Sequence, residues 1–206
     1  MESKFLNNTV LYNLGRASIR IKLSDGRNIY IDPAEGSKQD YKEPADLVLV
    51  THQHGDHNRV ELVDVKKTGT VIQCPYDISS GEAKEIDGIS INAVKAYNKN
   101  HIDEQCCGYI ITIKDLVIYH SGDTSTTDEM IEFLKYNIDY ALLCMDGYYN
   151  MGPEEAMKAA DIIDAKHVIP IHTSKSGLYD QDNVDKFTHA RRLIVKVGEK
   201  VILRSN

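Results

Sequence analysis

The sequence predicts an α/β or α+β fold, because segments with strand periodicity are interleaved with segments that carry helix signals. Residues 18–32 alternate apolar and polar side chains on both sides of Asp25-Gly26, which is typical of a β-hairpin with a tight turn. The same pattern predicts two further hairpins, residues 109–120 turning at Lys114-Asp115 and residues 193–204 turning at Gly198-Glu199.

Helix signals lie between these hairpins. Residues 126–136 open on a threonine suited to cap a helix, and residues 152–163 place Pro153 and two acidic side chains in a first turn. No linker rich in Pro, Gly or Ser divides the chain. Strands and helices therefore belong to one continuous unit.

Length and composition favour one domain spanning residues 1–206, since a chain with 42% hydrophobic content can bury a sizeable core. A formal net charge of -7 has the wrong sign for binding nucleic acid or an acidic membrane surface. No apolar run approaches the roughly 18 residues of a membrane span, and residues 1–16 lack the apolar segment of an export signal. We expect a cytoplasmic protein with a small-molecule substrate, and a homo-oligomer is compatible with the sequence.

Apolar segments with strand character repeatedly run into an acidic or imidazole side chain. The residues at these ends are Asp32, His52, Asp123, Asp146 and His172. Loops beyond the carboxyl ends of strands carry no ladder hydrogen bonds, so ligands commonly bind there. Five potential ligands at such positions predict a metal site.

The densest group of ligands is the segment from residue 52 to residue 57. His52 and His54 project to the same side of an extended segment, so both can reach one cation. Asp56 and His57 then point elsewhere, and four donors on a short loop cannot all enter one tetrahedral shell without strain. The pattern therefore favours two neighbouring cations over one, and the alternative to a metal site is a polar surface loop in which histidines merely cluster.

These residues also carry a family resemblance. The segment THQHGDH, residues 51–57, is similar to the signature loop of the metallo-β-lactamase-fold superfamily, and YHSGDT and VIPIHT resemble its later aspartate and histidine motifs. The segments AYN and MGPEEAMKAADII further resemble the small metal-dependent hydrolases related to L-ascorbate-6-phosphate lactonase. The resemblance implies a four-layer αββα sandwich of two mixed sheets flanked by helices, with metals between the sheets at one edge.

Carried over position by position, the resemblance implies two metal ions. The first would take His52, His54 and a third histidine, the second would take Asp56, His57 and His172, and Asp123 would bridge both. Asp56 and Asp123 are the implied catalytic carboxylates. Asp32 matches a position that supports the histidine loop from behind, and a turn aspartate before Pro33 is the alternative.

The third histidine has two candidates. His101 follows the segment that ends in AYN, where the resemblance places this ligand. His120 lies three residues before Asp123, a position that similar proteins fill with a histidine that does not bind the metal directly. We therefore favour His101 and expect His120 to be a supporting or core imidazole.

Two segments near the expected centre are candidates for substrate contacts. Tyr148 and Asn150 follow a strand end, so they either face the metals or form a surface turn before the next helix. Lys175 either binds an anionic substrate or is a solvated loop lysine.

The function that fits this ligand set is metal-dependent hydrolysis of a small anionic substrate, such as a lactone, a phosphodiester or a related ester. Two cations lower the pKa of a water molecule between them toward about 7 and polarise the group that it attacks. Zinc is the first expectation for both ions, with manganese or iron as alternatives. The competing functions are an iron-dependent oxidoreductase of the same fold and a metal-dependent binding module.

Overall fold

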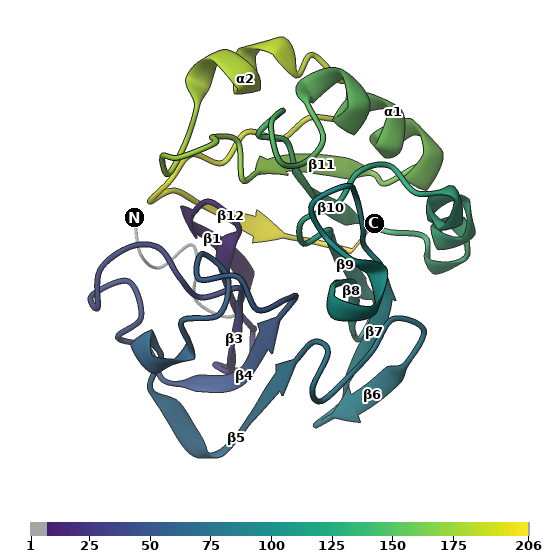
Figure 1. Ribbon diagram of the computed structural model, residues 1–206. Helices are drawn as coiled ribbons and strands as arrows, with labels where there is room; N and C mark the ends of the chain where they lie inside the picture. The colour runs from purple at the N-terminus through teal and green to yellow at the C-terminus, as the bar shows by residue number, and fades with distance from the viewer. Residues whose placement is uncertain (1–7, 206) are drawn as a thin grey trace.

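The computed structural model describes residues 8–205, in which two six-stranded mixed sheets lie against each other (Figure 1). The first sheet has the strand order β12 (Lys200–Leu203), β1 (Thr9–Gly15), β2 (Ser18–Lys22), β3 (Asn28–Ile31), β4 (Ala45–Val50) and β5 (Val65–Gln73). The second has the order β11 (His167–Ile171), β10 (Tyr140–Cys144), β9 (Leu116–His120), β8 (Cys107–Ile113), β7 (Ile89–Lys95) and β6 (Ala83–Ile86). The predicted sandwich of two mixed sheets is confirmed.

The main core fills the space between the sheets. Ile19, Ile31 and Leu49 of the first sheet share this cluster with Ile111 and Leu142 of the second, and all five are fully buried. Alternate residues of each strand face inward, so branched aliphatic side chains at these positions remove their apolar surface from water. This core fixes the two sheets relative to each other.

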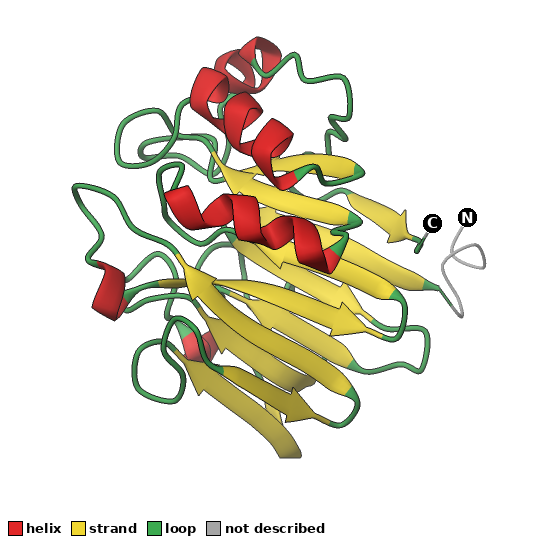
Figure 2. Cartoon of the chain, turned by 90° about the vertical axis from the view of Figure 1, so that its right-hand side faces the viewer, coloured by secondary structure: helices red, strands yellow, loops and turns green. Residues whose placement is uncertain are grey.

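The outer faces are covered differently. Helix α1 (Pro153–Ile163) and the 3₁₀ helix η4 (Asp128–Tyr136) lie over the second sheet, as Figure 2 shows, and α2 (Gln181–Lys186) packs beside α1. Over the first sheet, the 3₁₀ turn η2 (Val60–Leu62) and a loop that carries Tyr41 form the cover. The Tyr41 ring packs against Tyr30 of β3 at a centroid distance of 5.5 Å. This outer layer is therefore mostly loop.

Most predicted elements are present. The hairpins β2–β3 and β8–β9 are antiparallel, and α1 begins at Pro153. The third hairpin prediction is wrong, because β12 pairs with β1, whereas Leu193 donates its backbone N–H to Val168. The segment predicted as a capped helix is a 3₁₀ helix, and the Thr127 side chain makes no cap hydrogen bond.

The polar strand ends meet at one edge of the sandwich. Parallel pairing of β3 with β4, and of β10 with β9 and β11, brings their carboxyl ends to the same side. Asp32 and His172, which directly follow β3 and β11, have left-handed backbone conformations with φ of 48° and 43°. Such conformations are costly for residues other than glycine and concentrate at functional sites.

Among the described residues, no helix combines the length and the apolarity that crossing a membrane requires. The expectation that an export signal is missing rests partly on residues 1–7, which lie outside the described residues.

Candidate metal centre

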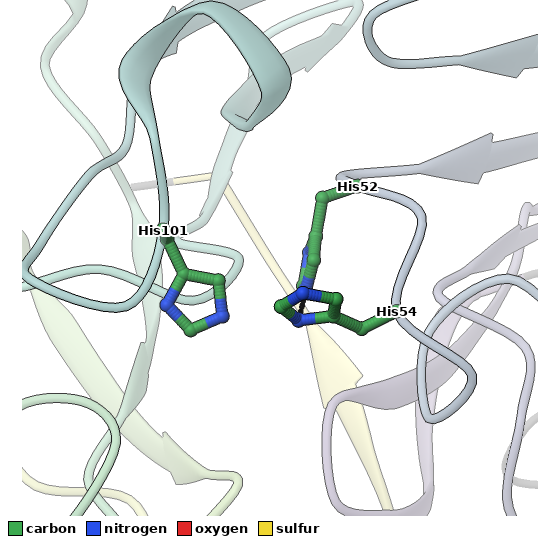
Figure 3. A group of neighbouring side chains, drawn as sticks. All are labelled: His52, His54 and His101. Atoms are coloured by element: carbon green, nitrogen blue, oxygen red, sulfur yellow. Dashed lines mark hydrogen bonds between the residues drawn. The ribbon is translucent and has the colours of Figure 1, made fainter.

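Three imidazoles meet at the polar edge of the sandwich. His52 and His54 lie on the loop after β4, and His101 comes from the loop before the 3₁₀ turn η3 (Asp103–Gln105). Figure 3 shows the three rings turned toward one another from two facing loops. The His101 ring centroid lies 5.0 Å from each of the other two, and one nitrogen from each ring falls within 4.8 Å of the others.

Hydrogen bonds to the Nδ1 atoms orient two of these rings. The Asn98 amide oxygen accepts from His101 Nδ1 at 2.9 Å. Thr51 Oγ1 donates to Asp32 and therefore accepts from His52 Nδ1, at 3.0 Å. The proton sits on Nδ1 in both rings, so each Nε2 keeps a lone pair, which is the form of histidine that binds metals.

A second group contains Asp56, His57 and His172, whose ligand atoms also lie within 4.8 Å of one another. Asp123, after β9, lies between the two groups. Its carboxylate oxygens are 3.4 Å from His57 Nε2, 3.4 Å from His101 Nε2 and 3.8 Å from His172 Nε2. The arrangement can hold two cations that share one carboxylate.

Asp32 is fully buried behind the histidine loop. Its carboxylate accepts hydrogen bonds from the Thr51 backbone N–H and hydroxyl, both at 2.7 Å, and from His57 Nδ1 at 2.8 Å. It therefore fixes the first residue of the loop and directs His57 Nε2 into the site. This is how an outer carboxylate orients a metal-binding imidazole.

His120 is buried, and both of its nitrogens already have partners. Nε2 donates to the Ala17 carbonyl at 2.9 Å, and Nδ1 accepts from the Gly122 N–H at 3.2 Å. No lone pair is left for a metal. His101, in contrast, directs its Nε2 toward Asp123.

The electrostatic balance of the site attracts positive charge. Burial opposes protonation of His57, but the Asp123 and Asp32 carboxylates outweigh it and raise the pKa of His57 well above 6.5. Burial also opposes ionisation of Asp123, yet nearby imidazoles hold its pKa well below the usual range. His52 behaves differently, because burial and the neighbouring His57 lower its pKa to about 3. A proton or a metal ion can supply the positive charge that these carboxylates favour.

Unpaired polar atoms test whether this residue set suits a metal. Within residues 8–205, His57 Nε2, Asp123 Oδ1 and both ring nitrogens of His172 are buried without a hydrogen-bond partner. Leaving such atoms unpaired is costly, and buried polar groups in proteins are nearly always satisfied. His57 Nε2 and His172 Nε2 lie 3.4 and 3.8 Å from the Asp123 carboxylate oxygens, so their lone pairs meet where divalent cations can accept them, whereas His172 Nδ1 faces Asp146 at 3.5 Å.

A pocket of about 420 Å³ opens over the two groups. We call it the Arg16 pocket, and it is lined by Arg16, Asn100, Tyr149 and Lys175 besides the side chains of the centre. The Lys175 ammonium lies 3.5 Å above the Tyr148 ring at the rim. Asn150 is buried instead, where it donates to Asp146 at 2.7 Å and accepts from Asn98 at 3.0 Å.

Two residues of the site escaped sequence reasoning, and a third has another role than expected. Arg16, in the turn between β1 and β2, forms ion pairs with Asp56 and Glu35, and nothing in its neighbourhood signals this role. Asn98 orients His101 from three residues away, a spacing that the segment YNKNH would have allowed us to notice. Asp146 was expected among the potential metal ligands at strand ends, but none of the three ligand groups formed by the described residues contains it; it accepts a hydrogen bond from the Asn150 amide and lies 3.5 Å from His172 Nδ1.

Comparisons with known proteins identify relatives of this chain. A model of the β-lactamase superfamily domain matches residues 10–172, which contain every ligand candidate. A UPF0173 metal-dependent hydrolase of Thermococcus kodakarensis is 34% identical, with 93% of this chain and 94% of the relative aligned.

Solved structures extend the likeness. A protein of Parabacteroides distasonis named a metal-dependent hydrolase superposes with a TM-score of 0.78 at 25% identity, covering 90% of this chain and 92% of that one. A protein of Thermotoga maritima, named a zinc-dependent hydrolase of the metallo-β-lactamase superfamily, gives a TM-score of 0.68 at 25% identity, covering 95% and 92%. Together with the sandwich and its histidine-rich edge, these matches establish that the chain belongs to the β-lactamase superfamily and, within it, to the UPF0173 metal-dependent hydrolases.

Proposed function

We propose that this enzyme uses two divalent cations to hydrolyse a small anionic substrate. The first ion would be held by His52, His54 and His101, the second by Asp56, His57 and His172, with Asp123 shared. The observation that carries the proposal is that the buried, unpaired Nε2 atoms of His57 and His172 converge on the Asp123 carboxylate. Zinc suits this imidazole and carboxylate set, as do manganese and iron.

When bound, two cations in such a site lower the pKa of a water molecule toward about 7 and polarise the carbonyl or phosphoryl group of the substrate. The chain itself supplies orientation and a hydrogen-bond acceptor. Asp32, Thr51 and Asn98 hold the imidazoles in the tautomer that leaves Nε2 free. Asp56 faces the pocket; burial opposes its ionisation, but His172 and His57 outweigh burial and lower its pKa, so its carboxylate is ionised and can orient the attacking water by accepting a hydrogen bond.

The substrate preference follows from the pocket. Arg16 and Lys175 bring positive charge to it, although the whole chain is acidic. A lactone, phosphodiester or ester with an anionic group therefore suits the pocket better than a neutral, bulky ester. Tyr148 contributes the aromatic face beneath Lys175. Asn150 supports the loop that carries Tyr148, because the Asn150 amide and the Tyr148 backbone N–H both donate to the Asp146 carboxylate.

The test combines metal analysis with a substrate panel. We expect elemental analysis to find two divalent ions per chain after loading, and Asp123→Asn to weaken the binding of both. We expect chelation to abolish turnover of lactones, phosphodiesters or thioesters, and zinc or manganese to restore it. A stoichiometry that never exceeds one ion contradicts the two-metal assignment. Oxygen consumption by iron-loaded protein, without chelator-sensitive hydrolysis, would support an oxidoreductase instead.

A further inference from the structure

A second pocket adjoins the Arg16 pocket at His54, which lines both. It has a volume of about 350 Å³, and we call it the Tyr76 pocket. Besides His52 and His54, its walls are Gln53, Pro75, Tyr76, Gln105 and Cys106. Proposed ligands of the first metal thus stand at the boundary between two pockets.

The two pockets differ in charge. The Arg16 pocket contains two cationic and two acidic side chains, whereas among residues 8–205 no Lys, Arg, Asp or Glu lines the Tyr76 pocket. Tyr76 is 74% exposed, so a large aromatic ring is open to solvent beside the metal centre. Burial raises the pKa of Cys106 to about 12, so its thiol is neutral. An uncharged, ring-containing or aliphatic group suits these walls.

The wall of the Tyr76 pocket is held in place. The Gln53 side chain donates to the Cys74 carbonyl at 2.8 Å and accepts from Asn58 at 3.2 Å. These contacts connect the histidine loop to the segment that leads into Pro75. Because these contacts already fix the Gln53 side of the pocket, binding a ligand there requires less ordering of the wall.

Within the Arg16 pocket, Lys175 is the cation that remains available to a ligand. Arg16 is engaged by Asp56 at 2.6 Å and by Glu35 at 3.1 Å. Lys175 forms no ion pair within the described residues, and its ammonium rests on the Tyr148 ring. An anionic group can therefore pair with Lys175 without displacing an existing carboxylate.

We infer that the substrate lies across His54, with its anionic group beside Lys175 and an uncharged, preferably aromatic or aliphatic, group in the Tyr76 pocket. The bond to be cleaved then lies between these groups, over the metal centre. This inference rests on the proposed function for the position of the reacting bond. The two binding subsites themselves are testable without turnover.

The experiment uses three ketones, which the enzyme cannot hydrolyse. Their equilibrium binding to zinc-loaded protein is measured by calorimetry or NMR titration. The ligand 4-oxo-4-phenylbutanoate carries both a carboxylate and a phenyl ring. Butyrophenone lacks the carboxylate, and 4-oxopentanoate lacks the ring. We expect 4-oxo-4-phenylbutanoate to bind at least about five times more tightly than either of the other two ketones. This factor corresponds to about 1 kcal/mol for each added contact.

Two variants separate the subsites. Lys175→Met is expected to weaken both carboxylates roughly fivefold and to leave butyrophenone unchanged. Tyr76→Ala is expected to weaken both phenyl ketones by a similar factor, roughly fivefold, and to leave 4-oxopentanoate unchanged. Lys84→Met and Ile131→Ala are the matched controls, because both side chains are exposed outside the two pockets. Elemental analysis of each variant checks that its metal content matches the wild type.

Several outcomes overturn the inference. Equal weakening of all three ligands by Lys175→Met, or none, removes Lys175 as the anion contact. Carboxylate binding that depends on zinc but not on Lys175 places the anion on the metals. Tyr76→Ala without effect on the phenyl ketones removes the second subsite. If the protein hydrolyses nothing in the substrate panel yet shows the expected pattern of affinities, the proposed function fails and the subsites stand.

Discussion

Arg16 Nη1 lies 2.6 Å from Asp56 Oδ2, and the Arg16 backbone carbonyl accepts the His172 N–H at 2.8 Å. One residue of the β1–β2 turn thus contacts two proposed ligands of the second metal. Arg16 itself has a left-handed backbone with φ of 47°. The guanidinium places a fixed positive charge beside a site that would also receive a divalent cation.

This relationship gives the first prediction. In metal-free protein, Arg16→Met leaves Asp56 without its cationic partner, and we expect the free energy of unfolding to fall by about 1 to 2 kcal/mol. With metal bound, the cations neutralise Asp56 and the repulsion from Arg16 is gone. We therefore expect zinc to raise the melting temperature more in the variant than in the wild type, as calorimetry would measure.

Arg27→Met is the control, because Arg27 pairs with Asp25 in an exposed hairpin turn far from the ligands in sequence. It should change stability equally with and without zinc. A smaller zinc effect in Arg16→Met than in the wild type would mean that orienting Asp56 outweighs the repulsion.

The second prediction separates His101 from His120. We expect His101→Ala to lose one metal ion and most activity, because it removes an inward-facing Nε2. His120→Ala should retain both ions but lose about 1 to 3 kcal/mol of stability, because it breaks the buried bond to Ala17. Elemental analysis and denaturant unfolding of both variants check this, and the reverse pattern would refute the ligand assignment.

The third prediction concerns Asp32. In Asp32→Asn one acceptor oxygen becomes a donor facing Thr51 Oγ1 and His57 Nδ1. We expect a loss of about 3 to 5 kcal/mol in stability, as for other broken buried pairs, and a roughly 10- to 100-fold loss of metal affinity. Chelator competition measures the affinity. Asp25→Asn, at an exposed turn carboxylate, should leave metal affinity unchanged.

The fourth prediction is a stability maximum near pH 6.5 for metal-free protein. Because the pKa of His57 is raised in the folded protein, protonated His57 stabilises the fold fully below pH 6.5. This stabilisation is lost as the pH rises through the pKa of His57 in the folded state. Burial lowers the pKa of His52, so this imidazole stays neutral when folded, and stability falls as the pH drops below 6.5 toward about 3.

Unfolding of chelator-treated protein, measured between pH 5 and pH 9, tests whether stability falls on both sides of pH 6.5. We expect His57→Gln to flatten the alkaline side of the profile and His52→Gln to flatten the acid side. Bound metal should remove the decline in stability at alkaline pH, because the imidazoles that bind the metal are already neutral and lose no proton as the pH rises. A wild-type profile that keeps rising to pH 9 without metal would contradict the role given to His57.

The fold was predictable where the signals are local. Alternation around Asp25-Gly26 identified a hairpin because its two strands are neighbours in sequence. The same alternation around Gly198 misled, because a strand pattern does not specify its partner, and β12 pairs with β1 from the other end of the chain. In the site, the ligand-rich segment from His52 to His57 could be identified from the sequence, whereas the role of Arg16 could not. Its role depends on a turn that approaches Asp56 only after the first sheet has formed.

The ligand candidates extend from His52 to His172 and come from strand ends of both sheets. During translation, a nascent chain that has emerged only as far as His101 carries the complete first group but neither Asp123 nor His172. An ion captured at that stage would have no shared carboxylate to retain it. Full occupancy of the proposed centre would thus become available only after β11 has been synthesised, and the ions would then connect the loops that follow β4, β7, β9 and β11.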